Sequence, residues 1–166
     1  MRRRAAVKRI VMPDAKFGSI LVAKFVNYIM LHGKKAVVEK EIYSAFSMLE
    51  DKLKRPALEI FEEAIAKITP AVETRSRRVG GATYQVPVEV SDRRGLMLAM
   101  QWLTKTVRTQ SGKSLSEKVY KSIVDIMNNT GWAFKKKEEV ARMAEANRAF
   151  AHYRYWLSCR THCGIA

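Results

Sequence analysis

The sequence predicts an all-α protein: a single domain of about six helices with a projecting two-stranded β-hairpin arm between the third and fourth helices. Two observations lead to this fold class. Apolar residues recur at intervals of three and four over most of the 166 residues, which is the stripe of core-facing helices. One central stretch instead alternates as strands do, around Gly80-Gly81, and this pattern predicts a hairpin.

Three helices are expected before the hairpin, over residues 19–31, 35–53 and 56–68. Each has apolar residues along one side, as a helix that packs on a core requires. Gly33 stands where a left-handed residue often follows a helix, and Pro56 suits a first helical turn. The first part of the chain therefore predicts three core helices.

The hairpin is expected at about residues 72–90. From Thr74 to Val88 the sequence reads Thr-Arg-Ser-Arg-Arg-Val-Gly-Gly-Ala-Thr-Tyr-Gln-Val-Pro-Val. Alternation places Tyr84 on the same face as the valines that follow it, and the glycine pair can supply the positive φ of a tight turn. Pro87 lacks an N–H group, which suits the edges of a two-stranded ribbon.

Three more helices are expected after the hairpin. Ser91-Asp92 can cap the fourth, and Ser114-x-x-Glu117 is a capping box that opens the fifth. The last helix is expected from about Glu138 to Tyr155, after the run Lys135-Lys-Lys137.

The two ends of the chain are expected to lie outside the helical domain, which spans residues 17–156. Residues 1–16 read as a basic extension that is ordered only on a partner, because little of it can be buried. Residues 157–166 are a C-terminal tail with Cys159 and Cys163. With a nearby histidine these would offer three metal ligands, whereas a structural zinc site has four, so no metal site is predicted.

Charge is the most informative part of the composition. The chain has 31 Lys and Arg against 16 Asp and Glu, a net charge of +15, and a polyanion usually neutralises such an excess. The cations gather in five clusters, whereas many acids lie between residues 39 and 63, which predicts one basic and one acidic face. No apolar run reaches the roughly 18 residues of a membrane span, so no membrane is expected. No secretory signal is seen, and the Arg-rich start leaves an organellar transit peptide as an alternative.

The hairpin carries the sharper functional argument. Arg75 and Arg77 are expected on one face and Arg78 on the other, and arginine can contact phosphate bidentately or stack on bases. Tyr84 suits stacking on a base or packing on the protein's own helices. The hairpin tip is therefore interpreted as a nucleic-acid contact, while the bases near the domain fit either role.

Catalytic chemistry is not indicated. There is no Ser/His/Asp or Cys/His set, no paired-carboxylate motif and no phosphate-binding glycine loop, so no enzyme, cofactor or small-molecule substrate is expected. An architectural DNA-binding protein is the remaining alternative. Such proteins usually carry an apolar wedge where this hairpin has Gly80-Gly81.

Three blocks of the sequence resemble one known family. They are Arg75 to Val88, Ile29-Met-Leu-His-Gly-Lys-Lys35, and Lys135-Lys-Lys-Glu-Glu139 followed by Met143-Ala-Glu-Ala-Asn-Arg-Ala-Phe-Ala-His-Tyr-Arg154. Over about residues 1–154 the chain resembles ribosomal protein seven of the small subunit, of the bacterial and organellar type. The resemblance implies a protein that binds the 3′ major domain of small-subunit rRNA and nucleates assembly of the head. It also implies a hairpin near the exit-site tRNA and the mRNA exit path.

The resemblance also implies site residues and partners. The rRNA-binding candidates are Arg2, Arg3, Arg4, Lys8, Arg9, Lys34, Lys35, Arg75, Arg77, Arg78, Arg93, Arg94, Lys135, Lys136, Lys137, Arg142 and Arg148. The candidates near exit-site tRNA and mRNA are Arg77, Arg78, Val79, Gly80, Gly81, Ala82, Thr83 and Tyr84. Besides these RNAs, the implied partners are neighbouring ribosomal proteins of the head and platform, nine and eleven. The implied location is a bacterial cytoplasmic ribosome, or a mitochondrial or plastid ribosome.

Two departures from the family pattern stand out. Trp132 and Phe134 precede the lysine run where family members usually have smaller residues, and these rings can make an extra contact or fill a local core. The chain also continues past its His-Tyr-Arg motif through Leu157 to Ala166, and no role is assigned to this tail.

Overall fold

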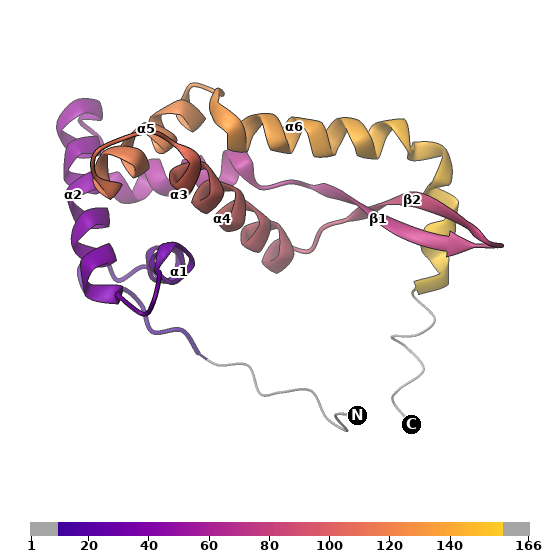
Figure 1. The fold of residues 1–166 in the computed structure, drawn as a ribbon, viewed down its shortest axis with the longest axis horizontal. Helices are drawn as coiled ribbons and strands as arrows, with labels where there is room; N and C mark the ends of the chain where they lie inside the picture. Colours follow the sequence, from indigo (N-terminus) through magenta and orange to yellow (C-terminus); the bar gives the residue numbers. More distant parts are fainter. Residues whose placement is uncertain (1–9, 158–166) are drawn as a thin grey trace.

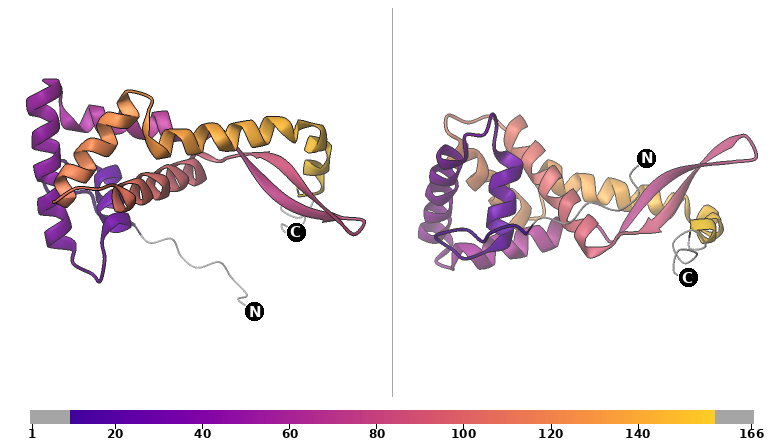
Figure 2. Two further views of the ribbon diagram at one scale, coloured as in Figure 1. Left: turned by 45° about the horizontal axis from the view of Figure 1, so that its top comes forward. Right: turned by 90° about the horizontal axis from the view of Figure 1, so that it is seen from below.

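The computed structural model describes the backbone of residues 10–157 and the side chains of residues 10–153. The molecule is elongated: most helices gather at one end and a hairpin projects at the other (Figure 1, Figure 2). Its elements are α1 (Ile20–Ile29), α2 (Lys35–Leu53), α3 (Ala57–Ile68), β1 (Val72–Val79), β2 (Ala82–Glu89), α4 (Asp92–Thr109), α5 (Leu115–Met127), α6 (Gly131–Ala146) and the 3-10 helix η1 (Arg148–Leu157).

The hydrophobic core lies among helices α1 to α5 and includes Ala133 from the first turn of α6. At its centre the side chains of Phe25, Phe46 and Phe61 are fully buried, one from each of the first three helices. The ring centroids of Phe25 and Phe61 are 5.1 Å apart, and those of Phe46 and Phe61 are 5.6 Å apart. Burial of each such side chain contributes on the order of 2 kcal/mol, and tilted ring contacts add to it. Most of the stabilisation is therefore concentrated in this bundle.

Glutamates of α2 cap the N-termini of two other helices. The Glu50 carboxylate accepts a hydrogen bond from the backbone N–H of Ala57, the first residue of α3, at 3.1 Å. The Glu41 carboxylate accepts one from the N–H of Ser116, in the first turn of α5, at 3.1 Å. The first N–H groups of a helix have no partner within the helix, and that end favours negative charge. Acids of the predicted acidic region thus help to hold the helices together.

Cations cap helix C-termini in the same manner. Lys67 Nζ donates to the carbonyl of Met127, the last residue of α5, at 3.0 Å. Lys137 Nζ donates to the carbonyl of Lys67, near the end of α3. Arg108 donates to the last two carbonyls of α1 at 3.3 and 3.4 Å. These hydrogen bonds satisfy carbonyls that lack a partner within the helix and place positive charge where the helix dipole favours it.

The hairpin follows the alternation of its sequence. Strands β1 and β2 are antiparallel, with Arg77 opposite Tyr84, and a two-residue turn joins them. In this turn Gly80 and Gly81 have φ values of 58° and 93°, the left-handed region that a tight hairpin turn requires. Directly opposite residues share a face, so Arg77 lies on the face of Tyr84 and Arg78 lies on the other.

The predicted fold class is confirmed: the described part of the chain has six α-helices and a two-stranded hairpin between α3 and α4. The predicted cap of α5 is confirmed as well, since Ser114 Oγ accepts a hydrogen bond from the N–H of Glu117 at 3.3 Å. Helix α1 ends two residues earlier than expected, at Ile29, and Gly33, with φ of 74°, lies in the loop. Pro56 precedes α3 rather than standing in its first turn.

The predicted last helix, from Glu138 to Tyr155, is wrong at both ends. Helix α6 begins at Gly131, so that the three lysines lie inside it, because lysine is a good helix former even in a run of like charges. Helix α6 ends just before Asn147, whose side-chain amide donates to the carbonyl of Met143 at 2.7 Å. The chain then continues as η1, which turns away from α6 and lies beside the hairpin (Figure 1).

Candidate nucleic-acid interface

Positive charge is concentrated in the second half of the chain. Residues 10–70 contain nine Lys and Arg against eight Asp and Glu, a net charge of +1. Residues 71–157 contain sixteen against eight, a net charge of +8. Helix α2, which has four of the acids, lies at the end of the molecule far from the hairpin tip (Figure 1). The charge is therefore distributed asymmetrically along the chain, and the acids of α2 lie far from the hairpin tip.

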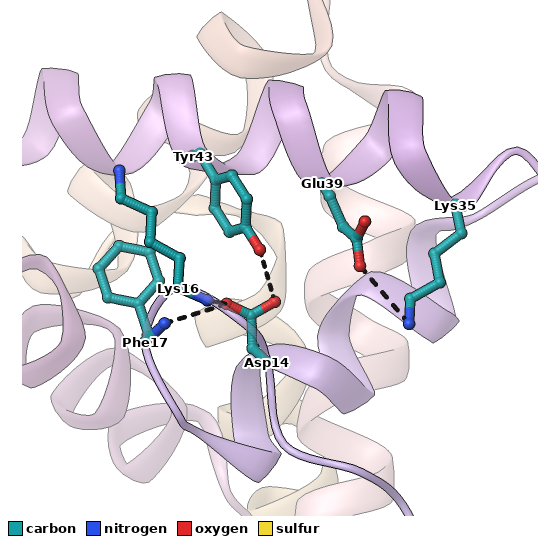
Figure 3. Close-up of polar contacts among 6 residues, drawn as sticks. All are labelled: Asp14, Lys16, Phe17, Lys35, Glu39 and Tyr43. Atoms are coloured by element: carbon teal, nitrogen blue, oxygen red, sulfur yellow. Dashed lines mark hydrogen bonds and ion pairs between the residues drawn. The ribbon is translucent and has the colours of Figure 1, made fainter.

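The exposed cations among the candidates come from the loop before α2, the hairpin, α4, α6 and η1. They are Lys34, Lys35, Arg75, Arg78, Arg93, Lys135, Arg142 and Arg148. Lys35 Nζ lies 3.5 Å from a Glu39 carboxylate oxygen one turn further along α2 (Figure 3), a surface pair that contributes little to stability. Exposed cations on several elements can each contact a different phosphate of a folded polyanion.

Arg75 and Arg94 share one buried carboxylate at the root of the hairpin. The Glu73 side chain accepts a hydrogen bond from Arg75 Nε at 2.6 Å and from Arg94 Nε at 3.2 Å, and only 8% of Glu73 is exposed. Burial by itself raises the pKa of Glu73, but the hydrogen bonds and charges of the two arginines outweigh burial and lower it. These two arginines are thus partly neutralised within the protein, and the pair between Arg94 and Glu73 joins α4 to β1.

The outer part of the hairpin contacts η1 on one face. The half-buried Tyr84 ring has its centroid 5.1 Å from that of Phe150 and 5.4 Å from that of Tyr153. Arg77 Nη1 donates to the backbone carbonyl of Tyr153 at 2.7 Å. Tyr84 therefore packs on the protein itself, whereas the neighbouring Arg78, on the opposite face, is exposed.

The three lysines of α6 have three different environments. Lys135 is exposed, and Lys136 Nζ lies 2.8 Å from a carboxylate oxygen of Glu139. Lys137 is half-buried and caps α3 through the carbonyl of Lys67. Sequence proximity therefore does not give these lysines one role, and Lys135 is the member best placed for a phosphate.

A turn before α1 anchors the N-terminal side of the chain to α2 (Figure 3). Asp14 is 6% exposed, and its carboxylate accepts hydrogen bonds from the N–H groups of Lys16 and Phe17, both at 3.2 Å, and from the Tyr43 hydroxyl at 2.8 Å. Burial and the hydrogen bond to Asp14 raise the pKa of Tyr43 to about 12. The expected end of the basic extension therefore falls within a turn that packs on the body of the protein.

Some sequence predictions fall outside the described residues. These are the extension candidates Arg2, Arg3, Arg4, Lys8 and Arg9, and the tail residues Cys159 and Cys163. Within residues 10–157, no group of three or more His, Cys, Asp or Glu side chains is placed to hold a metal ion. None of the helices in that range is long and apolar enough to cross a membrane.

Two cations of α4 were not among the predicted candidates. Lys105 and Arg108 line a hollow of about 330 Å³ with Tyr28 of α1. The Lys105 ammonium lies 4.9 Å from the centre of the Trp132 ring, a cation–π contact that leaves Trp132 38% exposed. Helix α4 continues to Thr109, so these two cations, three residues apart, share one face of the helix.

The fold and this surface together define a class of protein: a helical polyanion-binding protein with a β-hairpin arm. Residues 1–148 match the sequence model of the family described as ribosomal protein S7p/S5e. The chain is 50% identical over 155 residues to small ribosomal subunit protein uS7 of Thermotoga maritima, an alignment that covers 93% of this chain and all of that protein. It is 51% and 52% identical over 154 residues to the proteins of the same name from Rhodopseudomonas palustris and a Jannaschia species, covering 93% of this chain and 99% of each relative.

The chain therefore belongs to the ribosomal protein S7p/S5e family, and the resemblance found in the sequence is confirmed. Members of this family are structural proteins of the ribosome. The chain is accordingly a ribosomal protein of the small subunit with a structural role in translation, and it is not an enzyme.

Proposed function

We propose that the chain binds small-subunit rRNA directly through its positively charged half, in the 3′ major domain, and thereby nucleates assembly of the head. The observation that carries this proposal is the net charge of +8 over residues 71–157, against +1 over residues 10–70. Contacts to phosphates dominate the affinity of proteins for nucleic acids, because each neutralised phosphate releases condensed counterions.

The affinity resides mainly in the wider basic surface. Arg93, Arg142 and Arg148 are exposed on α4, α6 and η1, and each is free of the buried carboxylate that engages Arg75. The basic extension adds five more cations over residues 1–9. Many phosphate contacts spread over such a surface give tight binding without any single essential residue.

The role of the hairpin is to position its tip, and it contributes little to the affinity for rRNA. Residues 79–83 are all exposed, and the two glycines keep the turn slim. We propose that this tip, with Arg78 beside it, lies near the exit-site tRNA and the path of departing mRNA. Tyr84 and Arg77 contact Tyr153 of η1 instead, and these contacts hold the part of the hairpin next to the tip.

The proposed protein partners are the neighbouring ribosomal proteins of the head and platform, nine and eleven. The relatives named above are bacterial, which supports a location in the cytoplasmic ribosome of a bacterium. A mitochondrial or plastid ribosome is the alternative location. Crosslinking in intact cells, followed by identification of the attached RNA and proteins, tests both assignments.

A binding experiment with three nucleic acids tests the proposal. The full-length chain is titrated with a transcript of the 3′ major domain, a transcript of another small-subunit domain and a duplex DNA of similar length. The 3′ major domain is expected to bind at least about a hundredfold more tightly than either competitor. Equal affinity for duplex DNA would favour the architectural DNA-binding alternative, and equal affinity for both transcripts would remove the assignment to the 3′ major domain.

Paired charge variants test which surface binds. Lys135→Gln/Arg142→Gln removes two exposed charges from α6, and Lys40→Gln/Lys54→Gln removes two exposed charges from α2 and its C-terminus. The α6 pair is expected to weaken binding by about tenfold and the α2 pair by less than about twofold, at moderate salt. Equal losses would show that net charge alone, and not this surface, determines binding.

A further inference from the structure

We propose that η1 clasps the hairpin and fixes the direction in which its tip points. The hairpin clasp consists of Phe150 and Tyr153 of η1 with Arg77 and Tyr84 of the strands. Arg77 and Tyr84 are then positioning residues, and neither contacts RNA. That η1 fixes the direction of the tip is inferred from contacts within the protein. Only the purpose of this direction, which is to place the tip near RNA, rests on the proposed function.

Three contacts make up the hairpin clasp. The rings of Tyr84 and Tyr153 are stacked, with centroids 5.4 Å apart and an interplanar angle of 27°. Phe150 lies against the same Tyr84 ring at 5.1 Å, tilted by 46°. The Arg77 guanidinium donates to the Tyr153 carbonyl at 2.7 Å, a short hydrogen bond from a charged donor. Both strands of the hairpin are therefore held by one turn of η1.

These contacts lie on the outer part of the hairpin, far from its root, and therefore restrict the direction of the hairpin. Two residue pairs separate the pair of Arg77 and Tyr84 from the glycine turn, and this pair lies farther out along the hairpin than the fully buried Val86 at the root. A two-stranded ribbon is at most marginally stable by itself in water. With contacts at the root alone, the outer hairpin would be free to bend and twist. The hairpin clasp adds a second point of attachment, and two points define a direction.

The joint between α6 and η1 makes the support rigid. The Asn147 side chain donates to the carbonyl of Met143 at 2.7 Å, and the N–H of Phe150 donates to the carbonyl of Asn147 at 3.0 Å. The His152 imidazole is hydrogen-bonded to the carbonyl of Ala149 at 2.9 Å. These bonds fix the bend at which the chain leaves α6, so that α6 carries the hairpin clasp to the hairpin at a set angle (Figure 2).

The hairpin clasp also gives two adjacent arginines, Arg77 and Arg78, different roles. Because Arg77 faces η1 and Arg78 faces away from it, only Arg78 is exposed for an external phosphate. Ser76, Thr83 and Gln85 are exposed on the same outward face as Arg78. The outward face therefore contacts the partner, and the inward face sets where that contact occurs.

A distance measurement between two spin labels tests the hairpin clasp directly. Labels are attached at Ala82→Cys in the tip and Lys121→Cys on α5, in full-length chain with Cys159→Ser and Cys163→Ser. The parent is expected to give one narrow distance distribution. Phe150→Ala/Tyr153→Ala should broaden and shift it, and hydrogen exchange of the hairpin amides should accelerate by about tenfold or more.

Matched variants separate positioning from general stability. Tyr84→Phe keeps the ring and should retain the parent's distribution, whereas Tyr84→Ala should broaden it. Tyr120→Ala makes the same truncation on α5, at a half-buried tyrosine packed on the core, and should lower the melting temperature without moving the hairpin. An unchanged distribution in Phe150→Ala/Tyr153→Ala, or equal broadening in Tyr120→Ala, would overturn the proposal.

RNA protection connects the tip direction to function. In footprints on 3′ major-domain RNA, Phe150→Ala/Tyr153→Ala should lose the protections given by the hairpin while its overall affinity changes less than about threefold. Arg78→Ala should lose the same protections with the parent's spin-label distances, and Arg77→Ala should lose them with altered distances. Loss of protection in Arg77→Ala with unaltered distances would make Arg77 an RNA ligand and refute its positioning role. Absence of any protection by the parent would count against the proposed function, and the spin-label distances would still judge the hairpin clasp.

Discussion

In the helical bundle the rings of Phe25, Phe46 and Phe61 are fully buried, whereas in the outer hairpin Tyr84 is half-buried and rests on two rings of η1. The strands contribute one fully buried apolar residue, Val86. The bundle is thus stabilised by a continuous core, and the hairpin by a small number of separate contacts. The bundle can therefore lose a contact and keep its shape. The hairpin, in contrast, can change its direction without unfolding of the bundle.

The two regions also use charge differently. Around the bundle, carboxylates and cations face helix ends, as Glu50, Glu41 and Lys67 do, and their charges are used within the protein. Along α6 and the hairpin, several cations remain exposed, and Arg78 and Arg142 are examples. Charges in the bundle are therefore paired within the protein, and under the proposed function the exposed cations of α6 and the hairpin contact the RNA partner.

The largest expected effect comes from the bundle core. Phe61→Ala should lower the free energy of unfolding by about 3–5 kcal/mol, because it leaves a cavity against Phe25 and Phe46. Urea denaturation followed by circular dichroism measures the loss. The same truncation in the hairpin clasp, Phe150→Ala, should cost about 1 kcal/mol or less. Equal losses would contradict the distinction between a core and a clasp.

A smaller effect is expected at the anchor of the N-terminal turn. Asp14→Ala should cost about 2 kcal/mol, because three donors lose their shared acceptor. Tyr43→Phe removes one of the three bonds and should cost less. The folded-state pKa of Tyr43 is about 12, above its ordinary value of 10.0. Its contribution should therefore be complete below pH 10 and be lost as the pH rises through 12, which ultraviolet titration of tyrosine and unfolding at high pH measure.

Acid should weaken the root of the hairpin. The pKa of Glu73 is lowered from 4.5 in the folded protein, so its ionised form stabilises the fold. This stability is present above pH 4.5 and is lost as the pH falls through the lowered folded-state value, by about 1 kcal/mol in total because Arg75 and Arg94 are partly exposed. Carbon-13 NMR of the carboxyl follows the titration. Stability of Glu73→Gln that fell as steeply as the parent's in this range would exclude Glu73 as the source.

The smallest effect on stability is expected at the outward face of the hairpin. Arg78→Ala should change the free energy of unfolding by less than about 0.5 kcal/mol, because Arg78 is exposed. Thermal melting measures this change beside the RNA footprint. A large loss of stability would mean that the outward face is needed for folding, and the contrast between the two faces would fail.

Much of the fold follows from local sequence patterns. Apolar spacing predicts α2 to within its observed bounds, and the alternation around Gly80-Gly81 predicts the hairpin and the opposite faces of Arg77 and Arg78. Each of these features depends on residues close together in the chain. The predicted start of α6 is wrong because it is placed after the run Lys135–Lys137, although lysine favours helices.

The environments of the candidate residues could not be predicted in the same way. Arg77 meets Tyr153 across 76 positions of sequence, and Lys137 meets Lys67 across 70. Such contacts depend on how α6 and η1 lie against the hairpin and α3, which no local pattern encodes. Charge predicts that a surface binds a polyanion, but tertiary packing decides which cations remain available for it.

The central claim is that the exposed cations of the hairpin, α4, α6 and η1 neutralise RNA phosphates. The salt dependence of rRNA binding tests this claim most directly. The dissociation constant for 3′ major-domain RNA is measured from about 50 to 200 mM monovalent salt, for the parent and for Lys135→Gln/Arg142→Gln. The affinity of the parent should fall by orders of magnitude, and the log–log slope of the variant should be shallower by about one to two. Binding that does not depend on salt, or a variant with the parent's slope, would contradict the claim.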